Sequence, residues 1–281
     1  GVTSMTMLSI NTNVGALKAA QASYSVNKSM ETSMQRLASG QRINSAADDA
    51  AGLQIANRLT AEIQAINMSV RNAADAQAML ATAEGASKEI HLLLLRMREI
   101  AVQASNGTMD TADRAAIASE FTALEEEINR IGEDTTWAGN QLLDGTFSVA
   151  GDGRFQIGPD SGQTITHRIE DLATTAISIV AAIDVTTFTK AQSAITQLDK
   201  SISTVGTERQ QIGAVMNRLD HTIANLQQVS TNLQTSKGRI VDADFAAESS
   251  NLARTQVLQQ ASMAMLSQAN ANKQNILALF Q

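Results

Sequence analysis

The sequence contains no cysteine, a single proline and only 3% aromatic residues. The absence of cysteine excludes disulfide bonds, thiolate metal sites and cysteine nucleophiles. Proline ends helices, so its near-absence permits helices much longer than average. Compact cores usually draw on more aromatic volume than this, whereas long helical rods need little. The composition therefore favours an extended, mainly helical protein over a compact globular one.

Positive charge is also scarce. The 21 lysines and arginines stand against 28 acidic residues, which gives a net charge of −7 without any basic run. Nucleic acid is therefore not an expected partner. No apolar run approaches the roughly 18 residues that a membrane helix needs, so we expect no membrane span. The N-terminus has no cationic segment followed by an apolar core, so we expect no cleavable secretory signal.

The C-terminal stretch from Leu252 to Gln281 carries an apolar stripe with almost no charge around it. Between Thr255 and Gln281 the one charged residue is Lys273. Apolar and small residues recur there at steps of three and four, close to the period of a coiled coil, at Leu258, Ala261, Met265, Ala269, Ile276 and Leu279. A stripe of this kind must be buried against the N-terminus of its own chain, a neighbouring subunit or a membrane.

The stretch from Val14 to Leu37 repeats this character more weakly. Leu17 and Tyr24 lie seven residues apart on one helical face, among alanine, serine, glutamine and asparagine. Gly40 is expected to end this helix. The two ends of the chain are therefore candidates to pair with each other, and an ordinary surface helix is the alternative.

Two long helices are expected between the ends. One begins after a capping box at Ser45–Asp48 and continues to Asn106–Gly107, which is roughly 80 Å of helix. A second, shorter helix is capped at Asp110 and ends near Gly132, and another long one covers about residues 195–233. Between them, residues 144–185 gather glycine and β-branched residues, with two short strands around a Gly158–Gly162 turn. The expected fold is mainly α, a long helical rod or coiled-coil bundle with a small β-hairpin region at its far end.

The sequence contains no motif that would bring catalytic residues together. The three histidines, His91, His167 and His221, are far apart in sequence, and neither a His-Glu-x-x-His nor a Gly-x-Ser-x-Gly motif is present. The acidic run Glu125–Glu127 is typical of a solvated helix face. We therefore expect a protein that is not an enzyme and that has no catalytic, cofactor or metal site.

Several local motifs, in order along the chain, together resemble those of bacterial flagellin, the subunit of the flagellar filament. The resemblance covers nearly the whole chain, and the matching stretches are Ser9–Asn13, Leu37–Leu53, Arg96–Gln103, Asp242–Phe245, Leu258–Ala261 and Gln268–Asn270. It implies a secreted, extracellular subunit that polymerises for motility. Because only about 40 residues separate the inner helices, it also implies a short form with little or no outer variable domain.

The resemblance also implies a domain division and partners. Residues 1–50 and 241–281 would form a terminal coiled-coil domain, disordered in the monomer and lining the filament's inner tube. Residues 51–240 would form the rod domain, with the β-rich segment 144–185. The expected partners are other copies of the chain, the hook-associated junction and cap proteins, an export chaperone at the C-terminus on the type III route, and a vertebrate Toll-like receptor.

Receptor and subunit contact would fall on the long N-terminal helix. The resemblance points to Arg96, and Ile100 lies one turn further on the same face. If the connection at Asn106–Asp110 is a tight reversal, Glu120 on the next helix comes within about one turn of Arg96. One exposed patch is therefore expected to hold Arg96, Ile100 and Glu120.

Two alternative functions stay open at this point. A hook–filament junction protein of the same superfamily would share the terminal helices. A cell-surface adhesin would use the β-rich region to bind a ligand, and that role could coexist with filament formation.

Overall fold

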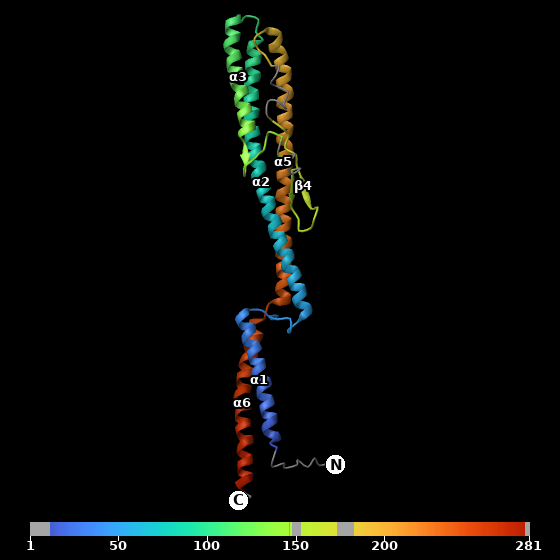
Figure 1. The fold of residues 1–281 in the computed structure, drawn as a ribbon, viewed down its shortest axis with the longest axis vertical. Helices are drawn as coiled ribbons and strands as arrows, with labels where there is room; N and C mark the ends of the chain where they lie inside the picture. The colour runs from blue at the N-terminus through green and yellow to red at the C-terminus, as the bar shows by residue number, and fades with distance from the viewer. Residues whose placement is uncertain (1–11, 146, 148–152, 173–182, 279–281) are drawn as a thin grey trace. The chain divides into compact units, whose positions relative to one another are not determined.

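The computed structural model describes residues 12–145, 147, 153–172 and 183–278, with the side chains of the last helix described as far as residue 271. It is mainly helical, as expected, and Figure 1 shows the order of the elements. The long helices are α1 (Val14–Ser39), α2 (Ala50–Ala104), α3 (Thr111–Asp134), α5 (Phe188–Val241) and α6 (Phe245–Ala278). The chain divides into two compact units, one of Gly1–Ala61 with Leu233–Gln281 and one of Glu62–Asn232.

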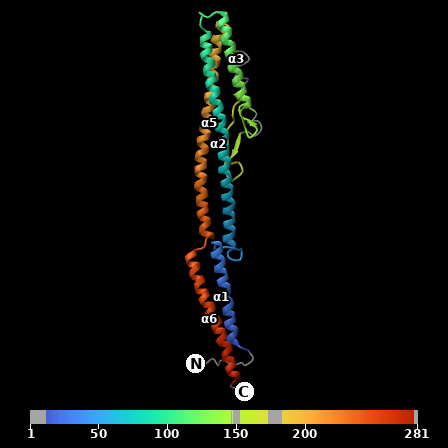
Figure 2. The ribbon, with the colours of Figure 1, turned by 90° about the vertical axis from the view of Figure 1, so that its left-hand side faces the viewer.

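In the first unit, α1 and α6 lie side by side and run antiparallel (Figure 2). The side-chain amide of Asn13 donates to the carbonyl of Ala269 at 3.2 Å, and the amide of Gln259 donates to Asn27 at 2.9 Å. Each helix turns a heptad stripe of mostly half-buried residues to the other: Ala16, Ala19, Ser23, Val26, Met30, Ser33 and Leu37 meet Leu252, Thr255, Gln259, Ser262, Leu266 and Ala269. The two ends of the chain therefore form a pair, as the sequence suggested.

Local bonds set the ends of both helices, and the expected end of α1 at Gly40 is present. Gly40 closes α1 in the left-handed conformation, with φ of 69°, which glycine adopts without strain. The Asp244 carboxylate starts α6 by accepting from the backbone N–H groups of Ala246 at 2.9 Å and Ala247 at 3.2 Å. Gln41 forms a bridge with Asp242, so the two chain segments also pair beyond the helix ends.

The capping box expected at Ser45–Asp48 is present only in part. The Asp48 carboxylate accepts from the backbone N–H and hydroxyl of Ser45, at 2.9 and 3.0 Å, and these bonds lower the pKa of Asp48. However, α2 begins later, at Ala50. The backbone N–H of Gly52, in its first turn, donates to the side chain of Asp49 at 2.9 Å. Asp48 therefore closes a turn before the helix, and Asp49 caps the helix itself.

In the second unit, α2 and α5 form a continuous antiparallel seam. The buried residues of α2 follow steps of three and four from Ile66 to Ala104, and those of α5 do so from Ala191 to Leu219. Polar bonds hold the register along the edges: Arg98 to Asp199 at 2.6 Å, Arg209 to Glu84 at 2.7 Å, and Gln77 to Asp220 at 2.6 Å.

The helix α3 packs beside the same seam and widens it. Asp110 caps α3 by accepting from the N–H of Asp113 at 2.8 Å, as the sequence predicts. Phe121 and Ile128 of α3 are buried in the core that α2 and α5 share. This part of α2 is therefore covered on two sides, which broadens the arc of its surface that is buried.

Two small antiparallel hairpins complete the second unit. The strands β3 (Arg154–Gln156) and β4 (Thr164–Thr166) fall where strands were expected and are shorter. A second hairpin, β1 (Thr136–Trp137) with β2 (Asn140–Gln141), lies in a segment where no strand was expected. Its two turn residues, Ala138 and Gly139, both have positive φ, at 49° and 85°, which is the backbone of the tight hairpin turns that match strand twist.

Candidate assembly surface

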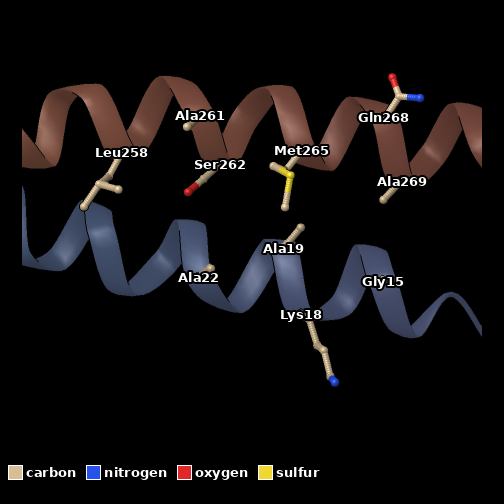
Figure 3. A pocket seen from close by; sticks show the side chains of 10 residues that line it. All are labelled: Gly15, Lys18, Ala19, Ala22, Leu258, Ala261, Ser262, Met265, Gln268 and Ala269. Atoms are coloured by element: carbon tan, nitrogen blue, oxygen red, sulfur yellow. The ribbon is translucent and has the colours of Figure 1, made fainter. Parts of the chain in front are cut away.

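An apolar groove follows one side of the α1–α6 pair. Its volume is about 530 Å³. Figure 3 shows its walls, with α6 above and α1 below, and the residues that line it are Gly15, Lys18, Ala19, Ala22, Leu258, Ala261, Ser262, Met265, Gln268 and Ala269. Met265 points across the groove toward Ala19, whereas Lys18 and Gln268 turn their polar ends outward.

Small side chains produce this groove. Five of its lining residues are glycine or alanine, on both helices, so neighbouring side chains do not fill the space between the two backbones. A Cβ atom added at Gly15 would make only ordinary contacts, at 3.5 Å to Asn13 and 3.9 Å to Ala269. An elongated apolar groove between two helices is the shape that accepts side chains from a further helix.

The structure corrects which face of α6 is covered by its own chain. Of the expected stripe, Ala269 lies in the α1–α6 seam, but Leu258, Ala261 and Met265 do not, and Leu258 and Met265 are 45% and 68% exposed. The seam against α1 uses the neighbouring positions Gln259, Ser262 and Leu266 instead. Ile276 lies within α6 but its side chain is outside the described part, and Leu279 lies outside the described residues altogether.

A second exposed apolar face lies on α1, away from the groove. Leu17 is 61% exposed, Tyr24 72% and Val14 53%, and none of them lines the groove. They are spaced so that they share one side of the helix. The α1–α6 pair therefore offers two different apolar surfaces that the isolated chain leaves uncovered.

Toward the other end of the pair, the lining becomes polar. A smaller hollow of about 300 Å³ there is lined by Ser29, Thr32, Ser33, Arg36, Glu248, Asn251, Arg254 and Thr255. Arg36 stands 3.7 Å from the Glu248 carboxylate, and its buried Nε has no acceptor among the described residues. This hollow continues the helical face of the groove, because Ser29, Thr32 and Arg36 follow from Gly15, Lys18 and Ala22 at heptad spacing.

The expected patch around Arg96 is present without Ile100. Arg96 of α2 donates to Glu120 of α3 at 2.7 Å and to Glu99 at 3.1 Å, and these bonds raise the pKa of Arg96. Arg96 and Glu120 are about half exposed, at 52% and 48%. Ile100 is only 1% exposed, so its expected place on the patch is wrong. The reason is α3, whose packing beside α2 turns that face of the helix into core.

Sequence reasoning missed a buried pair of polar side chains in the second unit. His167, just after β4, stands 3.3 Å from Glu208 of α5, and the two side chains are only 6% and 2% exposed. The distance joins atoms that lack hydrogen-bond geometry. The one sequence signal for this pair is Glu208 itself, a glutamate at a seam position of its helix.

The described part of the chain contains no group of three or more histidine, aspartate or glutamate residues placed to hold a metal ion. Within that same part, no helix has both the length and the apolar character needed to cross a membrane.

Comparison with known proteins gives a consistent result at both ends of the chain. Residues 10–148 match the model of the bacterial flagellin N-terminal helical region, and residues 189–280 match that of the bacterial flagellin C-terminal helical region. The chain is similar to the flagellin of Halalkalibacterium halodurans, with 42% identity over 97% of this chain and 99% of the relative. It is also similar to the flagellin of Bacillus subtilis, with 39% identity over 97% and 99% of the two chains.

Among solved structures, the chain resembles a putative flagellar hook-associated protein from Vibrio parahaemolyticus. The TM-score is 0.58, and the match covers 69% of this chain and all of the other, with 18% sequence identity. At that identity the likeness concerns the fold alone.

Proposed function

This chain belongs to the bacterial flagellin family and is a structural subunit of the extracellular flagellar filament, and we propose that it joins its neighbours through the α1–α6 groove. The observation that supports this proposal is the exposure of Leu258 and Met265 in a groove walled by glycine and alanine. Exposed apolar surface of this kind is costly in water and marks an interaction site. A helix of a neighbouring subunit is the occupant that the groove fits.

The second apolar face gives the polymer its direction. A subunit that contacts like surfaces forms closed dimers, whereas one that contacts a different surface on its neighbour builds rings or open helical filaments. The groove and the Leu17–Tyr24 face are two different surfaces of one unit. We assign both of them to subunit assembly, together with Ala261, Ala269, Ile276 and Leu279.

Hydrophobic stabilisation of the α1–α6 pair is weak in the isolated chain. Within the described parts of these two helices, the buried residues are Ser33 and Glu248, and neither is apolar. The proposal is therefore that residues 1–50 and 241–281 become ordered on assembly and line the inner tube. Residues 51–240 would form the rod domain with the β-rich segment 144–185.

Elongation of filament seeds tests the groove. Leu258→Glu places a charge in the groove, and Gln260→Glu places the same charge on an exposed position of the same helical turn outside it. We expect purified Leu258→Glu subunits to fail to elongate seeds, because a charge would have to be buried without a partner. Gln260→Glu subunits should elongate like the wild type. Normal elongation by Leu258→Glu would place the assembly surface elsewhere.

Further partners are proposals that rest on the family. They are the hook-associated junction and cap proteins, an export chaperone at the C-terminus, and a vertebrate Toll-like receptor on the Arg96–Glu120 patch. The role proposed here is structural, without catalysis. A junction-protein role has less support, since the hook-associated neighbour shares 18% identity with this chain and the two flagellins 39–42%.

A further inference from the structure

Met265 supplies the one sulfur atom among the ten residues that line the groove. Its side chain is 68% exposed, the highest value among the exposed methionines of the described chain. The residues around it are small, with Ala19 across the groove and Ala261 and Ala269 on its own helix. Met265 and Leu258 are therefore the two large apolar side chains that define the chemistry of this surface.

We infer that Met265 is an oxidation site through which peroxides switch off the free subunit's capacity to assemble. This inference rests on the proposed function of the groove. A thioether is readily oxidised to the sulfoxide, and the product is polar where methionine is apolar. Exposure and the small neighbours leave the sulfur open to a reagent as small as hydrogen peroxide.

The reaction balances with peroxide as the only co-reactant. A lone pair of the Met265 sulfur attacks one oxygen of hydrogen peroxide, so an S–O bond forms and the O–O bond breaks. The departing hydroxide takes up the proton from the oxygen bound to sulfur and leaves as water. Sulfur loses two electrons, peroxide gains them, and the product is methionine sulfoxide.

A sulfoxide in the groove opposes the docking of an apolar helix. The sulfoxide oxygen accepts hydrogen bonds from water, and an apolar helix that docks there would remove that water and bring no hydrogen-bond donor in its place. The charged end of Lys18 points away from the groove, so Lys18 does not donate to the oxygen either. Once a neighbour fills the groove, the same contact should shield the sulfur, so free subunits are sensitive and filaments are resistant.

Met263 provides a matched control two residues away. It is 61% exposed, close to the value for Met265, but it does not line the groove. Two residues correspond to about 200° around a helix, so the two side chains point to nearly opposite sides. Met79 and Met97, which are 3% and 0% exposed, provide the buried reference.

The test compares monomers and filaments treated with hydrogen peroxide. Peptide mass spectrometry should find that Met265 and Met263 are oxidised in the monomer well before Met79 and Met97, and that Met265 is protected in filaments. Seed elongation should fall at least tenfold in the treated wild type and in treated Met263→Leu. Treated Met265→Leu, which keeps an apolar side chain without sulfur, should elongate normally, and a methionine sulfoxide reductase should restore the wild type.

Three results would overturn the inference: oxidation of Met265 no faster than that of Met97, normal elongation by the treated wild type, or equal inhibition of treated Met265→Leu. The last would assign the effect to another methionine. Untreated Leu258→Glu separates the two proposals. If it elongates normally, the groove is not the assembly surface, whereas if it fails while treated wild type elongates, only the oxidation switch is wrong.

Discussion

Two glycines in the middle of α5 should be replaceable by alanine with a gain in stability. Gly206 and Gly213 are helical, and a Cβ atom added at either one meets nothing within 4 Å. Alanine in a helix interior is favoured over glycine by roughly 0.5–1 kcal/mol, because the unfolded glycine has more conformations to lose. Each substitution should therefore stabilise the second unit by about that amount, and both together by about twice as much, since neither site has a neighbour to disturb.

The same substitution at Gly153 should have the opposite sign. Gly153 has φ of 55°, an added Cβ would lie 1.9 Å from the carbonyl oxygen of His167, and the backbone N–H of His167 donates to the Gly153 carbonyl at 2.9 Å. Alanine there would lower the stability by roughly 1–2 kcal/mol through the left-handed conformation alone. Relief of the clash would strain the β3–β4 hairpin further.

Thermal unfolding followed by circular dichroism distinguishes these cases. For a unit of this size, 1 kcal/mol corresponds to a shift in Tm of roughly 2–4 °C. We expect Tm to rise for Gly206→Ala and Gly213→Ala and to fall for Gly153→Ala. A lower Tm for Gly206→Ala would refute the reasoning, because it would mean that the added methyl group meets a neighbour.

Two further predictions concern charged groups. Hydrogen bonds from Lys190 and Thr186 lower the pKa of Asp184 from 3.8 to about 2, so its stabilisation is present above pH 3.8 and lost as the pH falls through about 2. Asp184→Asn should therefore lower Tm at neutral pH, and the difference from the wild type should disappear below about pH 2; a difference independent of pH would contradict this. Arg96→Ala should weaken binding to the proposed Toll-like receptor by more than tenfold, or about 1.4 kcal/mol. Its Tm should change little, because exposed ion pairs contribute little to stability. Arg98→Ala, which breaks the similarly exposed pair with Asp199, is the control, and equal receptor binding by Arg96→Ala and the wild type would leave Arg96 as a solvated charge.

The elements and their ends could be predicted because single residues set them. Gly40, Asp110 and Asp244 end or begin helices through bonds to their immediate neighbours, and such bonds depend on local sequence alone. The β1–β2 hairpin was missed because its strands are two residues long, too short for an alternating pattern.

The register of the seams was harder to predict. In α2, Val70 and Gln77 continue the heptad position of Ile63, yet the buried residues are the adjacent Ser69 and Ala76. Ser69 is acceptable in the core because its hydroxyl donates to the carbonyl of Ala65 at 3.0 Å, within its own helix. A prediction from polarity places such a serine on the exposed face. Polarity alone also does not determine which of two adjacent stripes the neighbouring helix covers.

The same ambiguity explains the candidate site. On α6 the most apolar stripe, through Leu258 and Met265, is not the one that is buried against α1, and the stripe that is includes Gln259 and Ser262. A chain that folded alone would gain by turning the apolar stripe inward, since burial of each such side chain is worth roughly 1.5–3 kcal/mol. Because the pair instead buries weaker residues and leaves the stronger stripe open, its sequence is better matched to a structure that contains further helices. In a filament, neighbouring subunits would supply those helices. Burial of the same apolar surface would then stabilise both the ordered form of this unit and the addition of a subunit to the filament.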